Sequence, residues 1–292
     1  MFAPSYQNKT VFFMINLNGK LVNTTEATIS LNNRGLQYGD AVFETLKISG
    51  TKIFFWEDHY FRLMASMRIL RMEIPQTFTL EFLEAEILKT IDLEQSKTHR
   101  VKLLVWRDAE GKYTPTDNNI GYSVSSEILK VPFYTLNDEP YEVELYKDHY
   151  VMSSLLSTLK TTNKVINVVG SIWAKENGYQ NCLMLNDKKQ VIEALNGNIF
   201  LVKDGRIKTP PLTDGCLKGI IRKQILAILT AVPDYIIEEE SISPFELQKA
   251  DEIFITNVIT GIQPITKYRK KEYDNTIAKE LLGKLNAKAR FQ

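Results

Sequence analysis

Alternation of hydrophobic and polar residues indicates paired strands near the N-terminal end of the chain. The stretch FFMINLNGKLV (residues 12–22) predicts two strands joined by an Asn-Gly turn. The stretch AVFETLKISGTKIFFWEDH (residues 41–59) repeats this arrangement, with its turn at Ser49 and Gly50. A period of two is typical of half-buried strands, so we expect a mostly antiparallel sheet here.

Four further segments predict helices. HYFRLMASMRILRM (residues 59–72) places a hydrophobic residue at every third or fourth position, which is typical of an amphipathic helix. TLEFLEAEILKTI (residues 79–91) predicts a second helix. A third covers residues 164–178 and ends at Gly178, a residue type that favours the position after a helix C-cap. The fourth follows a glycine-containing turn within residues 216–231.

The remaining hydrophobic runs predict strands on both sides of one linker. The linker is residues 130–142, which contain two prolines and mixed polarity. Predicted strands cover residues 100–108, 121–129 and 142–148, a meander over 182–210, and a buried strand with a polar loop within 250–265. We therefore expect an α+β protein with two domains, each a mostly antiparallel sheet with helices. The smaller α/β domain would cover residues 1–134 and the larger C-terminal domain residues 138–292.

Composition narrows the class of protein. Hydrophobic residues make up 44% and charged residues 24% of the 292 positions, which is ordinary for a globular protein. A net charge of +1 argues against a nucleic-acid surface, and runs such as residues 225–232 are too short to cross a bilayer. Two cysteines, Cys182 and Cys216, do not predict a disulfide scaffold, so we expect a reducing cytoplasm. The three histidines lack metal-ligand spacing, so no metal site is expected.

Several segments carry polar groups suited to an anion or a cofactor. In KGIIR (residues 218–222) a glycine opens a helix, whose free N–H groups suit a phosphate. In FITNVITG (residues 254–261) a strand ends in donor groups. Arg62 suits a bidentate phosphate contact, and Glu193 follows two β-branched residues. Taken singly, each of these is more often an ordinary loop or surface residue, and the same holds for Lys160 in SLLSTLKTTNKVINVVG.

The order of these segments resembles that of the class IV aminotransferases, the pyridoxal-phosphate enzymes of fold type IV. The resemblance runs from about Met14 to Thr266. It rests on NNRGLQYGDAVFETLKI (32–48), DHYFRL (58–63), LKTTN (159–163), VIEALNGNIFLVKDG (191–205), LKGIIR (217–222) and EIFITNVITGIQPI (252–265). The most specific part of the resemblance runs from Glu193 to the Gly-Ile-x-Arg block at residues 219–222.

The resemblance implies a cofactor site for pyridoxal 5′-phosphate in the C-terminal domain. Lys160 would hold the cofactor covalently and Glu193 would pair with the pyridinium nitrogen. The residues implied around the phosphate and the ring are Arg62, Gly219, Ile220, Ile221, Thr256, Asn257, Val258, Leu217 and Asn198. Ile221 and Thr256-Asn257-Val258 depart from the hydroxyl residues that the family often has in these loops. We therefore expect backbone donors to carry more of the binding.

The resemblance also implies substrate contacts from the N-terminal domain. Phe43 and Glu44 would lie near the substrate, and Arg107 lies in VWRDAEGKY, similar to a loop that meets substrate carboxylates in several members. Lys112 occupies the place of the usual second arginine of that loop. A small amino substrate and a homodimer are implied as partners.

The reaction type stays open between three alternatives. Thr256-Asn257 is more like the 4-amino-4-deoxychorismate lyases, which release pyruvate and form 4-aminobenzoate. Asn163, three residues after Lys160, is typical of both these lyases and the D-amino acid enzymes. Thr45 could then donate a proton to the leaving group, which rests on its position alone. A branched-chain or D-amino acid aminotransferase is the first alternative, and a non-catalytic cofactor-binding protein is the second. We place the lyase slightly ahead.

Overall fold

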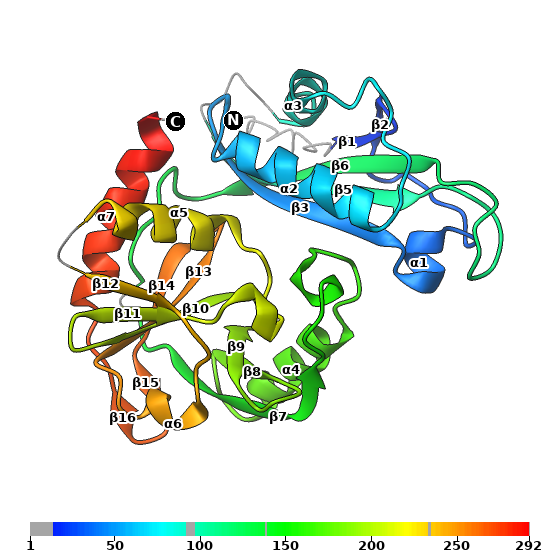
Figure 1. The fold of residues 1–292 in the computed structure, drawn as a ribbon. Coiled ribbons are helices and arrows are strands. Elements are labelled where there is room, and N and C mark those ends of the chain that lie inside the picture. The colour runs from blue at the N-terminus through cyan, green and yellow to red at the C-terminus, as the bar shows by residue number, and fades with distance from the viewer. Residues whose placement is uncertain (1–13, 92–96, 138, 233–234, 292) are drawn as a thin grey trace, which may run out of the picture.

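The computed structural model describes residues 14–91, 97–137, 139–232 and 235–291, which form two lobes, each built on its own β-sheet. Figure 1 shows the smaller lobe, in blue to green, above the larger lobe, in green to red. Helices and antiparallel-rich sheets occur in both lobes, which confirms the expected α+β class. Among the described helices, none is long and apolar enough to span a membrane.

The N-terminal lobe is a six-stranded antiparallel sheet covered by helix α2 (Trp56–Ile69), with α3 (Leu80–Leu88) beside it. Across the sheet the order is β2 (Lys20–Asn23), β1 (Met14–Leu17), β6 (Ile120–Leu129), β5 (Thr98–Arg107), β3 (Ala41–Ser49) and β4 (Lys52–Ile53). These elements match the predicted ones to within a few residues, apart from residues 12 and 13 of the first strand, which lie outside the described residues. The short helix α1 (Arg34–Tyr38) was not predicted.

The side chains of strand β3 show which face of this sheet packs on the helices and which faces the larger lobe. Val42, Leu46 and Ile48 lie in the core formed with Leu63 and other apolar residues of α2 and α3. Because side chains alternate along a strand, the residues between them point to the opposite face, which is turned toward the larger lobe. The hydrophobic pattern of β3 therefore presents its intervening side chains to the junction of the lobes.

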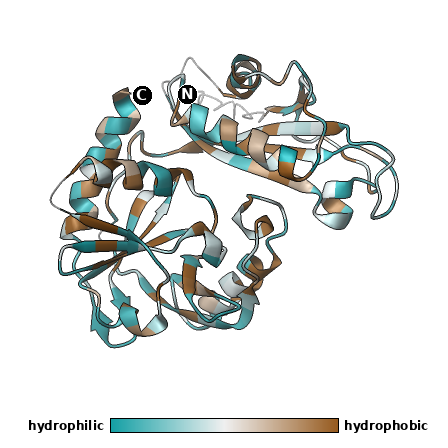
Figure 2. Cartoon of the chain, viewed as in Figure 1, coloured by the Kyte–Doolittle hydropathy of each residue, from teal (hydrophilic) through white to brown (hydrophobic). Residues whose placement is uncertain are grey.

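The C-terminal lobe is a larger, mixed sheet. The order is β12 (Ile236–Glu239), β11 (Arg206–Thr209), β10 (Gly197–Lys203), β9 (Val191–Ala194), β8 (Asn181–Asn186), β7 (Glu142–Val151), β15 (Lys267–Tyr268) and β16 (Lys271–Glu272), with β13 (Glu252–Asn257) pairing with β10 and with β14 (Gly261–Ile265). Three pairs, β7–β8, β7–β15 and β11–β12, are parallel. Hydrophobic residues follow these strands in Figure 2.

Helices α4 (Val165–Glu176) and α5 (Ile220–Thr230) match their predictions, and Gly178 follows the C-cap of α4 with φ +77°. The expected loop after β13 is wrong in part, because residues 261–265 form the second strand of a hairpin. Two helices, α6 (Pro244–Leu247) and α7 (Thr276–Phe291), were also missed. The buried carboxylate of Glu252 accepts hydrogen bonds of 2.8–3.1 Å from Ile277 and Ala278, and thus caps the start of α7.

The two lobes meet through backbone pairing and hydrophobic packing. Val42 of β3 forms an antiparallel bridge with Thr161, and Thr162 donates its N–H to the carbonyl of Ala41 at 3.1 Å. Phe54 and Phe55 of the N-terminal lobe belong to the hydrophobic core that includes α5 and α7. Tyr134, which lies between β6 and β7 in the chain, belongs to the same core. A domain boundary between residues 134 and 138 stays a prediction.

Candidate active site

The segment that carries Lys160 is held between the lobes. A short 3₁₀ turn, Leu156–Thr158, precedes it and α4 follows it. The carbonyl of Lys160 accepts a hydrogen bond of 2.9 Å from the N–H of Phe43, and the side chain of Asn163 donates to the carbonyl of Gly39 at 3.0 Å. The amine of Lys160 lies 4.5 Å from the centre of the Phe43 ring. The backbone of Lys160 is therefore bound to β3, and its amine lies beside Phe43 on the face of β3 that is turned toward the larger lobe.

One cavity of about 560 Å³ brings the predicted cofactor residues together. This volume lies in the range of small-molecule sites. All eleven residues predicted to contact the cofactor line it: Arg62, Lys160, Glu193, Asn198, Leu217, Gly219, Ile220, Ile221, Thr256, Asn257 and Val258. Phe43 and Thr45 line it as well. Six separate stretches of sequence thus converge on one space, whereas the individual roles of the residues remain predictions.

Lys160 and Glu193 are the two titratable groups that the cofactor would use. Burial lowers the pKa of Lys160 to about 8, and the positive charge of Arg62 acts in the same direction. Burial raises the pKa of Glu193, against the lowering effects of the Leu217 N–H and of the Lys164 and Lys160 charges. The Leu217 N–H donates to Glu193 Oε2 at 2.9 Å. The Lys160 amine loses its proton easily, which suits covalent attachment of the cofactor. The buried carboxylate of Glu193 suits pairing with a protonated ring nitrogen.

The N-terminus of α5 forms one end of the cavity. Its N-cap is Gly219, and no side chain caps the free N–H groups of the first turn. A Cβ at Gly219 would lie 1.9 Å from Asn198 Oδ1, so only glycine allows this close approach. Asn198 in turn donates to the carbonyl of Leu217 at 2.8 Å. The helix start is therefore held open toward the cavity, where its dipole favours an anion.

A buried hydroxyl supports the same assignment. Thr256 Oγ1 is buried without a hydrogen-bond partner among the described residues, although it lines the cavity. Asn257 Oδ1 accepts the N–H groups of Ile259 and Thr260, both at 3.0 Å, and thus shapes the turn after β13. An orphaned hydroxyl in the same cavity as an uncapped helix start fits a phosphate group, which accepts several hydrogen bonds. The residues present therefore fit pyridoxal phosphate.

Arg62 reaches this end of the cavity from α2. Its Nε donates to Glu44 Oε1 at 2.8 Å, a second N–H contacts Glu44 Oε2, and Nη1 donates to the carbonyl of Lys218 at 2.9 Å. A guanidinium has five N–H donors, so two remain for an anion. The phosphate contact expected of Arg62 stays a prediction, and the structure places its guanidinium against the C-terminal lobe at Lys218.

Glu44 differs from its prediction. It does not line the cavity; its carboxylate is enclosed by Arg62 and His59 on the α2 side of β3. The reason is strand alternation, since Phe43 and Thr45 face the cavity and Glu44 must face the other way. Burial would raise the pKa of Glu44, but the charge of Arg62 and the hydrogen bonds with His59 and Arg62 lower it to about 2. Glu44 therefore orients Arg62 from outside the cavity.

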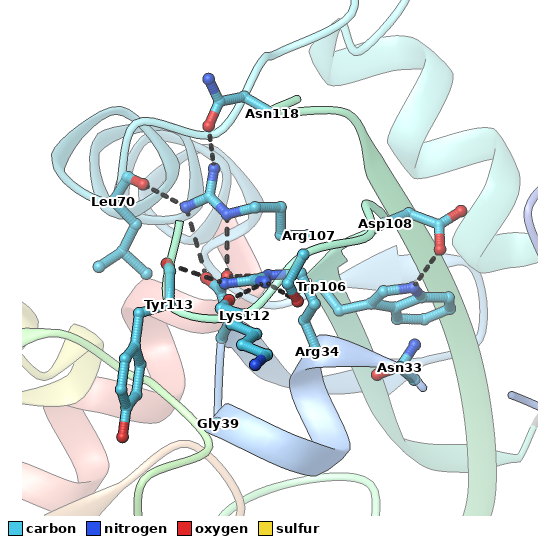
Figure 3. A network of polar contacts seen from close by, with 12 residues as sticks. Asn33, Arg34, Gly39, Leu70, Trp106, Arg107, Asp108, Lys112, Tyr113 and Asn118 are labelled. Atoms are coloured by element: carbon cyan, nitrogen blue, oxygen red, sulfur yellow. Dashed lines mark hydrogen bonds and ion pairs between the residues drawn. The ribbon is translucent and has the colours of Figure 1, made fainter. Parts of the chain in front are cut away.

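Arg107 and Lys112 also lie outside the cavity. All five N–H donors of Arg107 are engaged, by Asp40, Leu70, Arg71 and Asn118. Figure 3 shows the contacts with Leu70 and Asn118. Arg34 shares the Asp40 carboxylate and holds the carbonyls of residues 111–113. Within its own chain Arg107 therefore fastens the loop, and the carboxylate contact implied for it stays a prediction. Lys112 is exposed beyond it.

Sequence reasoning missed several residues at the cavity. Lys164 and Asn167 line it together with Glu193, and Arg100 and Glu127 lie at the side formed by the N-terminal sheet. Lys102 places its amine 4.9 Å from the Phe43 ring centre. Lys164 follows Lys160 by four residues, and positions 100 and 102 alternate with the buried residues of β5. Both spacings were available as signals in the sequence.

Comparisons with known proteins agree with this site. The family model for amino-transferase class IV matches residues 41–268. The chain is 28% identical over 275 residues to a "Putative branched-chain-amino-acid aminotransferase" of Methanocaldococcus jannaschii, covering 94% of each chain. It is 28% identical over 258 residues to a D-alanine aminotransferase of Listeria monocytogenes, covering 86% of each.

Solved structures share the fold. A branched-chain aminotransferase from Thermoproteus uzoniensis with norvaline superposes with a TM-score of 0.84 at 24% identity, over 94% of this chain and 93% of the other. The PLP form of a branched-chain amino acid aminotransferase from Thermobaculum terrenum superposes with a TM-score of 0.83 at 22% identity, over 96% of this chain and 95% of the other. A "Putative 4-amino-4-deoxychorismate lyase" from Legionella pneumophila superposes with a TM-score of 0.75 at 20% identity, over 91% of this chain and 97% of the other.

Fold and site together define a pyridoxal-phosphate enzyme of fold type IV. The chain belongs to the class IV aminotransferase family. Its cofactor is pyridoxal 5′-phosphate, and the resemblance inferred from the ordered motifs is confirmed.

Proposed function

We propose that this protein is an aminotransferase that uses pyridoxal phosphate to move the amino group of an amino acid to an oxo acid. One observation carries the proposal: the Lys160 amine and the Glu193 carboxylate line a single cavity whose far end offers uncapped N–H groups. The relatives described as branched-chain and D-alanine aminotransferases support this reaction above the lyase that the sequence motifs slightly favoured.

The residues would divide the work as follows. When bound, the cofactor withdraws electrons from the substrate Cα. Lys160 would take the Cα proton on its amine and give a proton back later in the reaction. Its pKa of about 8 makes this exchange possible near neutral pH. Glu193 would keep the ring nitrogen protonated. Arg62, the first turn of α5 and Thr256 would hold the phosphate.

Substrate carboxylates would meet the basic residues of the N-terminal sheet. Arg100 lines the cavity, and Lys102 lies beside Phe43 on the same face of β5. Arg100 is partly neutralised by Glu127, with which it forms an exposed ion pair at 2.5 Å. Lys102 has no ion pair among the described residues. These two side chains would bind the carboxylate for which the sequence resemblance implied Arg107, whose own N–H donors are engaged by its neighbours.

A lyase acting on 4-amino-4-deoxychorismate is the second candidate. It is favoured by Thr45, which lines the cavity and whose hydroxyl has no hydrogen bond among the described residues. The hydroxyl could donate a proton to a leaving enolpyruvyl group. Replacing Thr45 with Val would then reduce pyruvate release far more than it reduces cofactor loading.

A screen of purified enzyme distinguishes the two candidates. Amino donors are supplied with an oxo-acid acceptor, and both the oxo-acid product and pyruvate from aminodeoxychorismate are measured. Oxo-acid formation from common amino acids without aminodeoxychorismate cleavage supports the aminotransferase, and the reverse result contradicts it. Borohydride reduction followed by mass spectrometry tests the site itself, since the adduct should lie on Lys160. The Lys160→Ala variant is the control and should give no adduct.

A homodimer is also part of the proposal. A second cavity of about 740 Å³ adjoins the site at Glu193 and Lys164. Large exposed apolar side chains surround it: Tyr38, Tyr113, Met152, Leu156 and Val165. Tyr113, at the tip of the loop that Arg34 and Arg107 fasten, is 90% exposed. Such a patch marks an interface. Sedimentation equilibrium should give twice the chain mass, and Tyr113→Asp should lower it toward the monomer.

A further inference from the structure

Lys47 is a buried lysine at the junction of the lobes. It belongs to β3 and is 1% exposed. Its Nζ donates hydrogen bonds to the carbonyls of Phe133 and Ile259, at 3.2 and 3.3 Å. It also lies 4.6 Å from the centre of the Tyr134 ring. One ammonium group thus connects the N-terminal sheet, the segment between the lobes and the turn after β13.

This ammonium group has no carboxylate partner among the described residues. Burial lowers the pKa of Lys47 to about 8, and no neighbouring negative charge opposes that shift. Two carbonyls and an aromatic ring partly solvate the charge. An isolated buried charge is costly, so buried lysines are normally paired or serve a ligand. A negative charge nearby would compensate for the cost.

The turn that Lys47 contacts borders the cofactor cavity. Residues 256–260 all line this cavity. The carbonyl of Ile259 points back to Lys47, and the side chain of Asn257 takes up the N–H groups of Ile259 and Thr260. Among the described residues, the N–H of Val258 and the hydroxyl of Thr256 have no hydrogen bond. These two donors are therefore available to an anion in the cavity.

The same turn is clamped from behind. Gly261 has φ +73°, and a Cβ there would lie 2.6 Å from the Tyr134 ring. Asn286 of α7 holds Tyr134 by hydrogen bonds to its N–H and carbonyl, at 3.0 and 2.8 Å. The position of the turn thus depends on Tyr134, and Lys47 lies between that ring and Ile259.

We propose that Lys47 is a positioning residue for the phosphate end of the cofactor, acting through Ile259 and supplying the positive charge that the phosphate balances. The inference rests on the proposed assignment of the phosphate to this end of the cavity. The inference also explains why the chain buries the Lys47 ammonium without a carboxylate, since the phosphate of the ligand would supply the negative charge. Lys47 would also make phosphate binding depend on contact between the two lobes.

The test compares binding of pyridoxal phosphate with binding of pyridoxal, which lacks the phosphate. Lys47→Gln keeps a hydrogen-bond donor and removes the charge, whereas Lys47→Arg keeps the charge. Lys52→Gln is the matched control, because Lys52 Nζ also donates to a backbone carbonyl of the other lobe, that of Arg290 at 2.6 Å, away from the cavity. Dissociation constants are measured by absorbance titration of the apoproteins. Urea midpoints show that each variant is folded, and Lys47→Met, which also removes the charge, is used if Lys47→Gln is not folded.

We expect Lys47→Gln to weaken binding of pyridoxal phosphate by about 10-fold or more and to leave binding of pyridoxal within about 2-fold. Lys47→Arg should restore most of the phosphate preference, and Lys52→Gln should change neither constant. Equal losses for both ligands, or no loss for either, would overturn the inference. Wild-type protein that does not prefer the phosphorylated ligand would instead contradict the proposed function, so the two failures are distinguishable.

Discussion

The backbone N–H of Phe43 donates a hydrogen bond of 2.9 Å to the carbonyl of Lys160. The bond joins the first long strand of the smaller lobe to the segment of the larger lobe that would hold the cofactor. The place of the Lys160 amine is therefore set by both lobes together. Changes at their junction should affect chemistry as well as stability.

The pH dependence of cofactor capture should report the amine of Lys160. Only the neutral amine is a nucleophile, so the rate of covalent capture by apoprotein should rise with pH through about 8 and then level off. Lys164→Met removes a positive charge that lowers the pKa of Lys160, so the midpoint should move up. Stopped-flow absorbance gives both profiles. A midpoint near the ordinary lysine value of 10.5 would contradict the prediction. Because Lys47 also has a pKa near 8, the profile is repeated with Lys47→Gln.

Arg107 and Arg100 should respond in opposite ways. Arg107→Met breaks a buried network and should cost about 3 kcal/mol of unfolding free energy, with little change in the KM of the amino donor at low temperature. Arg100→Met should change stability by less than about 0.5 kcal/mol and should raise that KM several-fold. Urea unfolding and steady-state kinetics measure both quantities. A large KM effect from Arg107 in stable protein would restore it as a substrate residue, contributed to the site of a second copy.

Glu44 should make the protein sensitive to acid. Its pKa is lowered from 4.5 to about 2 in the folded state, so its stabilisation is fully present above pH 4.5 and is lost as the pH falls toward 2. The shift corresponds to about 3 kcal/mol. Glu44→Gln should be less stable at neutral pH and should show a flatter decline over that window. Glu272→Gln, at an exposed position, should follow the wild type. Parallel curves for wild type and Glu44→Gln would count against the ion pair.

Two glycines should differ sharply on replacement by alanine. Gly219→Ala would force Asn198 away from the start of α5 and should weaken binding of pyridoxal phosphate about 10-fold or more. Gly283 lies within α7, and a Cβ added there would meet open space, so Gly283→Ala should raise the unfolding free energy by about 0.5–1 kcal/mol. Fluorescence titration and urea unfolding give the two quantities. Unchanged cofactor affinity in Gly219→Ala would show that Asn198 moves without consequence.

Local patterns in the sequence were enough for most elements of the fold. The hairpin over residues 14–23, the helix at 56–69 and the strands at 98–107 and 120–129 follow from period two or period 3.6. The hairpin after β13 was missed because its turn was taken as the start of a loop. Helix α7 was missed although its start is capped, since the cap comes from Glu252, more than twenty residues earlier.

The sequence by itself determined which residue types could make the site. The lysine, the glutamate, the glycine at a helix start and the arginine of α2 were all recognisable from their ordered motifs, and one cavity contains them. Their chemistry is local, because a helix start or a strand end offers donors wherever the helix or strand lies.

Only the tertiary structure decided which charged groups are available. Arg62 keeps two N–H donors because Glu44 and Lys218 use three, whereas Arg107 keeps none because its own loop and its neighbours use all five. Lys47 looks like an ordinary strand lysine until Phe133 and Ile259 enclose it. Availability depends on contacts between residues far apart along the chain, and those contacts exist only after the two lobes have packed together.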